Sequence, residues 1–167
     1  MPALTQLARL MTRPDPLLTW RWIPGAVPFG AEYGVDTSYV ETFEIPFNNV
    51  KTEGVFCAGG YSYFPGFHDV SAFNVTFYGD SKGNALKYIM GWKSKVKSFK
   101  TGIYALPPEF KRDWHVSLLD PAGEIVITVA LEGCWPADTG QISLTYEDGG
   151  SRITFNQNFS VDNCKVL

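Results

Sequence analysis

Hydrophobic and polar residues alternate in two segments of the chain, which is the pattern of a half-buried β-strand. In residues 73–78, apolar side chains occupy every second position. In residues 153–161, one face would carry Ile153, Phe155, Phe159 and Val161 and the other Thr154, Asn156, Asn158 and Ser160. Both segments are predicted to be strands, and the C-terminal one is expected to be the longest in the chain.

One segment has the apolar spacing of an amphipathic helix. Apolar residues recur there at intervals of three or four, at Leu86, Ile89, Trp92, Val96 and Phe99. Asp80 or Ser81 is available as the N-cap, and lysines crowd the C-terminal end, where the helix dipole favours positive charge. We therefore expect one flanking helix over about residues 81–99, weakened mildly by Gly83 and Gly91.

Turn-forming residues separate further short strands. Tyr39–Ile45 is rich in β-formers and ends at Pro46. The turn at residues 120–123 has proline at its second position and lies between apolar runs at 114–119 and 125–131, which predicts a hairpin.

The remaining segments are less regular. A second hairpin is expected, in which residues 142–146 pair with 153–161 across a Gly-containing turn. Residues 51–69 combine glycines with many aromatics, and we interpret them as a long, sticky loop with a short strand near 61–64.

Prolines and glycines set the N-terminal part of the chain apart. Residues 14–36 contain four prolines and three glycines together with Trp20 and Trp22, and are predicted to form an extended arm anchored by aromatic residues. The expected organisation is an arm over residues 1–36 followed by a single β domain over 37–167.

Composition narrows the possible classes of protein. The 167 residues suffice for one domain with a sizeable core, and 45% of them are hydrophobic, which excludes a disordered chain. The 16 glycines and 11 prolines favour turns between short strands. No apolar run is long enough for a transmembrane helix, and the first residues do not have the pattern of a secretion signal.

Charge is low overall but unevenly distributed. A formal net charge of −3 argues against a protein that holds nucleic acid by neutralising phosphates. Residues 82–112 hold eight Lys or Arg and one acid, whereas residues 113–167 hold two Lys or Arg and eight acids. This split could join copies of the chain side by side or mark a solvated helix face, and the sequence leaves both interpretations open.

Catalytic chemistry has few candidates in this sequence. Neither of its two histidines, His68 and His115, has a catalytic spacing, and the common nucleophile, phosphate-binding and dinucleotide-binding motifs do not occur. Cys57, Cys134 and Cys164 are widely spaced without a Cys-x-x-Cys pair, which argues against disulfides and a zinc site. We expect neither enzymatic activity nor a cofactor or metal.

Three passages together resemble a known family. They are Phe64-Pro65-Gly66-Phe67 followed by the strand at 73–80; the helix ending near Trp92 and Lys93 with a Gly- and Pro-bearing loop after it; and Leu131-Glu132-Gly133-Cys134-Trp135-Pro136 followed by the final strand pair. This pattern is similar to the tail-tube proteins of contractile-tailed bacteriophages, whose relatives include tube-like baseplate proteins and, more remotely, type VI secretion inner tubes. The resemblance covers about residues 37–165. The Pro-rich arm is similar to the start of baseplate-proximal members.

The resemblance implies an antiparallel β-sandwich or rolled barrel with one flanking helix. Copies would form hexameric rings whose inner sheets join into a continuous β-barrel, and the rings would stack into a channel for DNA passage during ejection. The chain would thus be a structural virion protein of the tail, either a tube subunit or a tube-like baseplate or tube-initiator protein, synthesised in the host cytoplasm.

The resemblance also implies the partners. These are further copies of the chain and sheath, baseplate hub or tail terminator proteins, with DNA passing transiently and without sequence-specific binding, and with no membrane. The expected inter-subunit or core anchors are Trp20, Trp22, Phe64, Pro65, Phe67, Trp92, Trp135 and Pro136. The arm and residues 51–69 are expected to lie on a neighbouring copy or the next ring.

Two expectations concern the channel and the alternative class. Polar residues of the C-terminal strand would suit a wet bore, and the helix lysines should lie away from it, since a basic bore would hold phosphate.

The alternative is a non-catalytic β-sandwich module that binds carbohydrate or protein, because exposed aromatics can stack on sugar rings.

Overall fold

The computed structural model describes residues 17–139, 142, 144 and 150–167. The strands in this part of the chain are β1 (Trp22–Pro24), β2 (Val40–Phe43), β3 (Asn48–Cys57), β4 (Gly60–Val70), β5 (Phe73–Tyr78), β6 (Arg112–Leu119), β7 (Ile125–Thr139), β8 (Thr154–Ser160) and β9 (Asn163–Val166). The helices are α2 (Gly30–Tyr33), α3 (Asn84–Val96), α4 (Pro107–Phe110) and a 3-10 turn at Thr37–Tyr39. The predicted mainly β, antiparallel fold is confirmed. The single flanking helix that was expected corresponds to α3, and the described residues contain two further short helices, α2 and α4.

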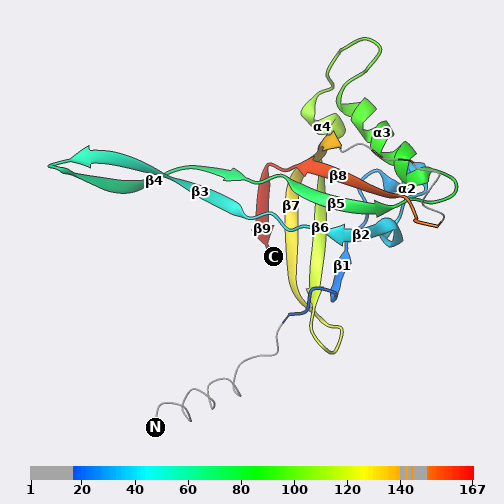
Figure 1. The fold of residues 1–167 in the computed structure, drawn as a ribbon, viewed down its shortest axis with the longest axis horizontal. Helices are drawn as coiled ribbons and strands as arrows, with labels where there is room; N and C mark the ends of the chain where they lie inside the picture. The colour runs from blue at the N-terminus through cyan, green and yellow to red at the C-terminus, as the bar shows by residue number, and fades with distance from the viewer. Residues whose placement is uncertain (1–16, 140–141, 143, 145–149) are drawn as a thin grey trace, which may run out of the picture.

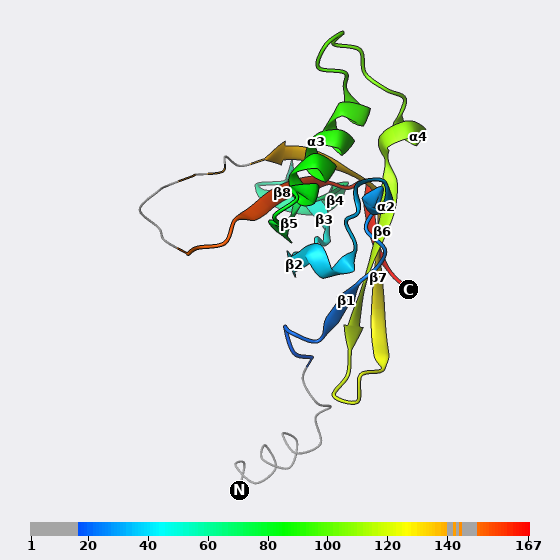
Figure 2. The ribbon, with the colours of Figure 1, turned by 90° about the vertical axis from the view of Figure 1, so that its right-hand side faces the viewer.

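One bent sheet and one long hairpin make up the β structure. Seven strands form a sheet in the order β1-β6-β7-β8-β5-β2, with β9 also paired to β7, whereas β3 and β4 pair with each other. Figure 1 shows β6 and β7 running across the direction of β5 and β8, and the β3–β4 hairpin projecting from the body. Turning the molecule shows α3 lying beside β8 (Figure 2).

The bend in the sheet lies at Gly133 in β7. Before it, Leu131 points into the core; after it, Cys134 and Pro136 do, so the buried positions shift by one residue. Gly133 has a φ of 69°, and the pairing with β6 is irregular at the same point. This β-bulge turns the strand, so that its first part pairs with β6 and β9 and its last part with β8.

Aromatic side chains fill the core between the sheet and α3. The ring of Phe159 lies 5.5 Å from Phe73, 5.5 Å from Trp92 and 5.6 Å from Trp114, measured between centroids. The indole N–H of Trp92 donates to the carbonyl of Phe110 at 2.8 Å. The indole N–H of Trp114 donates to the carbonyl of Gly25 at 3.3 Å. Because each indole N–H has a partner, Trp92 and Trp114 can both be fully buried.

The segment expected to be an extended arm contributes to this core. Residues 22–24 form β1, which pairs with the edge of β6, and Val27 and Val35 are buried. Trp22 is half-buried, with its ring 6.2 Å from that of Phe43.

Two strand predictions were wrong. Residues 51–69 were expected to be a loop with a short strand near 61–64, but they lie almost entirely in the β3–β4 hairpin, in which that short strand is part of β4. The longest strand in the described part of the chain is β7, with 15 residues, rather than the C-terminal strand. The strand expected at 142–146 falls mostly outside the described residues.

The helix forms where it was predicted, but it is shorter, and its N-cap is Gly83. Asp80 still serves the helix, because its carboxylate accepts from the backbone N–H of Asn84 at 2.7 Å. Gly91 was expected only to weaken the helix, but it also lets α3 pack closely on α2, since a Cβ there would overlap the ring of Tyr33.

Candidate assembly surfaces

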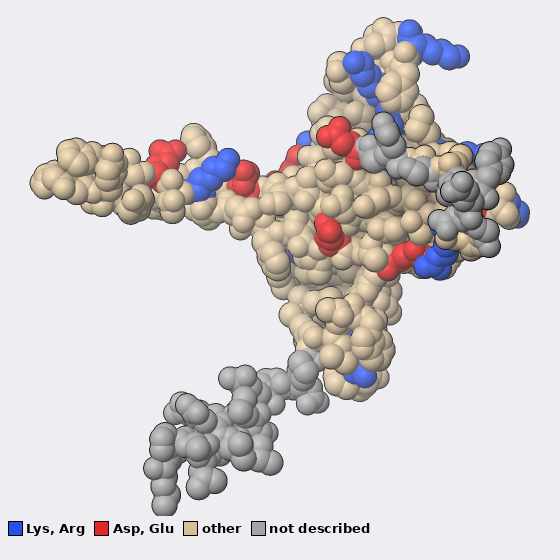
Figure 3. Space-filling view, viewed as in Figure 1, with Lys and Arg blue, Asp and Glu red and all other residues tan. Residues whose placement is uncertain are grey.

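The β3–β4 hairpin is the most exposed element of the described chain. Its strands meet at a two-residue turn, where Ala58 and Gly59 have φ angles of 49° and 87°, as expected for a tight hairpin turn. Nearly every residue of both strands is exposed. Residues 54–67 contain no charged side chain, and the outer part of the hairpin in Figure 3 shows no charge on the visible face.

One face of the hairpin tip is aromatic. Phe56 is paired with Tyr61 and Gly54 with Tyr63, so these side chains share one face. The Phe56 and Tyr61 rings are 5.4 Å apart and the Tyr61 and Tyr63 rings 6.5 Å apart. The three side chains are 64%, 66% and 71% exposed, respectively. We call Phe56, Tyr61 and Tyr63 the aromatic face.

The base of the hairpin is fixed to the body. The side-chain amide of Asn48 donates to the carbonyl of Cys164 on β9 at 2.7 Å and accepts from its N–H at 3.2 Å. Asn49 donates to the hydroxyl of Ser71 at 2.9 Å. The hairpin is therefore anchored at its base, while its tip projects away from the body (Figure 1).

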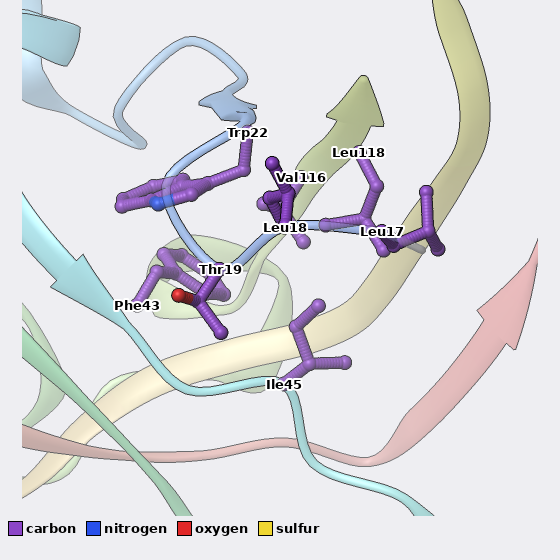
Figure 4. A pocket seen from close by; sticks show the side chains of 8 residues that line it. All are labelled: Leu17, Leu18, Thr19, Trp22, Phe43, Ile45, Val116 and Leu118. Carbon is purple, nitrogen blue, oxygen red and sulfur yellow. The ribbon is translucent and has the colours of Figure 1, made fainter. Parts of the chain in front are cut away.

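An apolar groove lies between the arm, β2 and β6. It has a volume of about 340 Å³ and is lined by Leu17, Leu18, Thr19, Trp22, Phe43, Ile45, Val116 and Leu118, none of them charged. Figure 4 shows these side chains gathered around the groove from three separate segments. Leu17 and Leu18 are exposed, whereas Val116 is buried.

The face of the sheet opposite the core is polar and uncharged along β5 and β8. Cross-strand pairs on this face are Asn74 with Asn158, Thr76 with Asn156, and Tyr78 with Thr154. At its edge, the carboxylate of Glu44 accepts from the Asn74 side chain at 3.1 Å. We call these residues of β5 and β8 the polar sheet face.

The Lys-rich helix lies on the other side of this sheet. Tyr88 of α3 lies 5.5 Å from Phe77 of β5, and Trp92 lies 5.5 Å from Phe159 of β8, between ring centroids. Both phenylalanines are on the core face, so α3 and its lysines are separated from the polar sheet face by the sheet itself.

Several charges are neutralised within one copy. Lys111 of the basic segment pairs with Asp162 of the acidic segment at 2.6 Å, and Lys95 pairs with Glu32 at 3.0 Å. Burial lowers the pKa of Lys93, and Asp138 acts in the opposite direction. Ion pairs within one copy thus neutralise part of the positive charge of residues 82–112 and of the negative charge of residues 113–167.

The eight expected anchors lie in different surroundings. Trp92 and Pro136 are buried, Trp22 and Trp135 are half-buried, and Trp20, Phe64, Pro65 and Phe67 are exposed. The Trp135 ring contacts that of Phe110 at 6.0 Å. The structure places Phe64, Pro65 and Phe67 on one strand of the hairpin, Trp20 and Trp22 around one pocket, and Trp92 and Trp135 both in contact with Phe110.

The sequence interpretation missed the aromatic face. Residues 58–60, Ala-Gly-Gly, separate Phe56 from Tyr61 and Tyr63, which alternate with Ser62. Glycines between two aromatic, period-two runs are a hairpin signal, and it could have been read from the sequence.

The described residues form no candidate metal centre. Among them, no group of three or more His, Cys, Asp or Glu side chains is arranged to hold a metal ion. No helix in that part of the chain is long and apolar enough to cross a membrane.

The fold is similar to that of components of contractile injection systems. A chain of the anti-feeding prophage tube-terminating cap matches with a TM-score of 0.65 and 15% identity over 93% of both chains. A chain of the six-fold symmetrised baseplate of the same prophage matches with a TM-score of 0.66 and 8% identity over 93% of this chain and 97% of that one. A chain of the extended sheath–tube complex of an extracellular contractile injection system matches with a TM-score of 0.59 and 14% identity over 96% of both.

These structures share one class of fold with the chain. Neither a protein-family model nor a curated protein matches the sequence. The structural likeness confirms the tail-tube fold that the sequence resemblance implied.

Proposed function

We propose that the chain is a structural subunit of a contractile tail-like assembly, in which copies form rings around a channel. The observation that carries this proposal is the fold. It matches cap, sheath–tube and baseplate chains over more than nine-tenths of this chain and of each matched chain. Whether it acts as a tube subunit or as a tube-like baseplate protein, its first partners are further copies of itself. Sheath or baseplate proteins would be the next.

The polar sheet face supplies the channel wall in this proposal. Its amide and hydroxyl side chains are wettable and carry no charge themselves. Glu44 lies at one edge of the face, and Arg152, paired with Glu41, lies over the ring of Tyr78. A wall without lysines, whose neighbouring Arg152 is already paired with Glu41, does not neutralise phosphate, so DNA could pass without being held. The position of the α3 lysines behind the sheet agrees with this orientation.

Electron microscopy of the purified full-length chain tests the proposal. Negative-stain images should show rings or tubes of about six-fold symmetry, which would be the expected result if the sheets join around a channel. A protein that stays monomeric at high concentration and binds a glycan would contradict the proposal and favour the binding-module alternative.

The channel wall has a separate test. In rings of the double variant Thr76→Lys and Asn156→Lys, the polar sheet face gains positive charge, so the rings should bind short duplex DNA in a salt-dependent way. Rings of the unmodified chain and of Ser81→Lys, which alters an exposed turn before α3, should not. Equal DNA binding by all three proteins would show that this face does not line the channel.

A further inference from the structure

The tip of the β3–β4 hairpin has no surface to cover it within the described part of its own copy. An isolated two-stranded hairpin is at best marginally stable in water. Here the base is held by Asn48, while the three side chains of the aromatic face are all exposed. An uncharged aromatic surface of this kind marks a site of contact with another surface.

From these features we infer that the aromatic face of one copy seats in the apolar groove of a second copy. The inference rests on the proposed function only in that an assembly brings the second copy into reach. It adds to that function by naming both halves of one contact.

The aromatic face is built to lie flat against a surface. A Cβ on Gly54 would stand 3.3 Å from the Tyr63 ring and 3.4 Å from that of Tyr61, so glycine lets both rings settle on the strand. Three aromatic side chains that are each about two-thirds exposed can bury on the order of 400 Å² on contact. This is a large part of the ~800 Å² that each partner buries in a standard interface.

The groove matches this face in chemistry. Its volume of about 340 Å³ is at the lower end of the range for pockets that enclose ligands. It would therefore receive one or two rings of the aromatic face, and the rest of that face would lie against its rim. Neither the groove lining nor residues 54–67 contain a charge, so docking would desolvate no ion. Thr19 in the groove offers a hydroxyl to a tyrosine O–H, which seeks a partner when buried.

The two halves cannot meet within one copy. Figure 1 shows the hairpin extending sideways from the body, away from β1 and the lower end of β6, where the groove lies. A contact between two different surfaces is heterologous, and repeating it yields a closed ring or an open stack rather than a dimer. The contact therefore belongs to an assembly of many copies.

A native thiol at the hairpin tip makes the contact testable. Cys57 is exposed, whereas Cys134 and Cys164 are buried, and burial raises the pKa of Cys134 to about 12. A maleimide reagent should therefore react first with Cys57. With Thr19→Cys, each copy would carry one reactive thiol at the tip and one in the groove.

The experiment treats the assembled Thr19→Cys protein with a short bismaleimide and separates the products on a denaturing gel. We expect a ladder of covalent dimers, trimers and larger species, at least about ten-fold stronger than in two controls. These controls are Thr19→Cys with Cys57→Ser, and Ser81→Cys in the native background. Equal ladders in the Ser81→Cys control would overturn the inference.

Microscopy of the same samples separates the inference from the proposed function. Rings or tubes without a ladder would overturn the inference and leave the proposed function standing. A ladder without rings or tubes would support the inference and contradict the proposed function. The absence of both ladder and particles would contradict the inference and the proposed function alike. A ladder that appears only after deletion of residues 1–16 would show that this segment occupies the groove in the full chain, which also overturns the inference.

A pair of hairpin variants tests the contact without crosslinking. Tyr63→Ser removes a ring from the aromatic face, and Phe64→Ser removes a ring from the opposite face. Tyr63→Ser should raise the protein concentration needed for assembly by about ten-fold or more, and Phe64→Ser by much less. An equal effect of both variants would contradict a one-sided contact.

Discussion

Gly133 decides the path of β7 at the scale of single residues. Its positive φ permits the bulge, its N–H donates to the carboxylate of Asp113 at 3.0 Å, and a Cβ would overlap the carboxylate of Asp162. The passage Gly133-Cys134-Trp135-Pro136 suggested its tryptophan and proline as the anchors. The structure shows that its glycine re-aims the strand and that Cys134 and Pro136 then follow into the core.

Gly133→Ala is expected to destabilise the chain strongly. The left-handed conformation costs about 1–2 kcal/mol for alanine, and overpacking against Asp162 adds about 1–3 kcal/mol. Gly102→Ala is a matched control, because Gly102 has a φ of 72° and a Cβ added there would meet no atom within 4 Å. Urea unfolding should show the larger loss for Gly133→Ala, and equal losses would mean that the contact with Asp162 is unimportant.

The tryptophans also differ in their expected contributions. Trp92→Ala should cost about 3–5 kcal/mol of unfolding free energy, because Trp92 is fully buried and its indole N–H has a partner. Trp135 is half-buried against Phe110, so Trp135→Ala should cost clearly less in the monomer. If denaturant unfolding gives equal losses for the two, Trp135 is a core residue rather than a surface one.

Protonation of Asp80 should loosen the start of α3. Desolvation raises the pKa of this carboxyl, but hydrogen bonds from the backbone of Asn84 and Ala85 outweigh it, so the pKa lies below its ordinary value. The stability from the carboxylate is therefore present above the ordinary pKa of about 4 and is lost as the pH falls through the folded value. Thermal unfolding should show a smaller loss of melting temperature on acidification for Asp80→Ala than for the unmodified chain.

Elements with one buried face could be predicted from the sequence. Burial of one face spaces the apolar residues regularly along an element. This regular spacing predicts β5, the hairpin of β6 and β7, and α3. The β3–β4 hairpin buries neither face in one copy. Its sequence therefore lacks the sustained alternation of apolar and polar residues that marks a half-buried strand. The end of β7 was missed because Gly133 and Pro136 resemble strand breakers, although one forms a bulge and the other lies after it.

The fixed base of the hairpin gives a prediction at this scale. Asn48→Ala removes two hydrogen bonds to the backbone of Cys164, each worth about 1 kcal/mol. Hydrogen exchange at the Cys164 amide should accelerate by about ten-fold or more. Asn49→Ala, which loses a bond to Ser71 instead, should leave that amide protected. Unchanged exchange in Asn48→Ala would show that the hairpin base is held by other contacts.

At the scale of the whole molecule, the distribution of charge separates folding from assembly. Ion pairs such as Lys111 with Asp162 lie within one copy, whereas the proposed contact between copies is uncharged. The division of charge along the sequence could not reveal this, because the fold brings the two segments together.

Assembly should therefore depend little on salt. Light scattering between about 0.05 and 1 M NaCl should report the same particle size, because screening weakens only contacts between charges. Dissociation at high salt would mean that opposite charges on neighbouring copies hold the assembly together.

The uncharged tip of the hairpin has a consequence for temperature. Burial of aromatic surface is driven by the release of water, and this driving force weakens on cooling. An assembly fastened by such tips would loosen in the cold and tighten on warming, the opposite of one fastened by hydrogen bonds. Particles formed at about 37 °C and chilled would come apart into intact, folded subunits that reassemble when warmed.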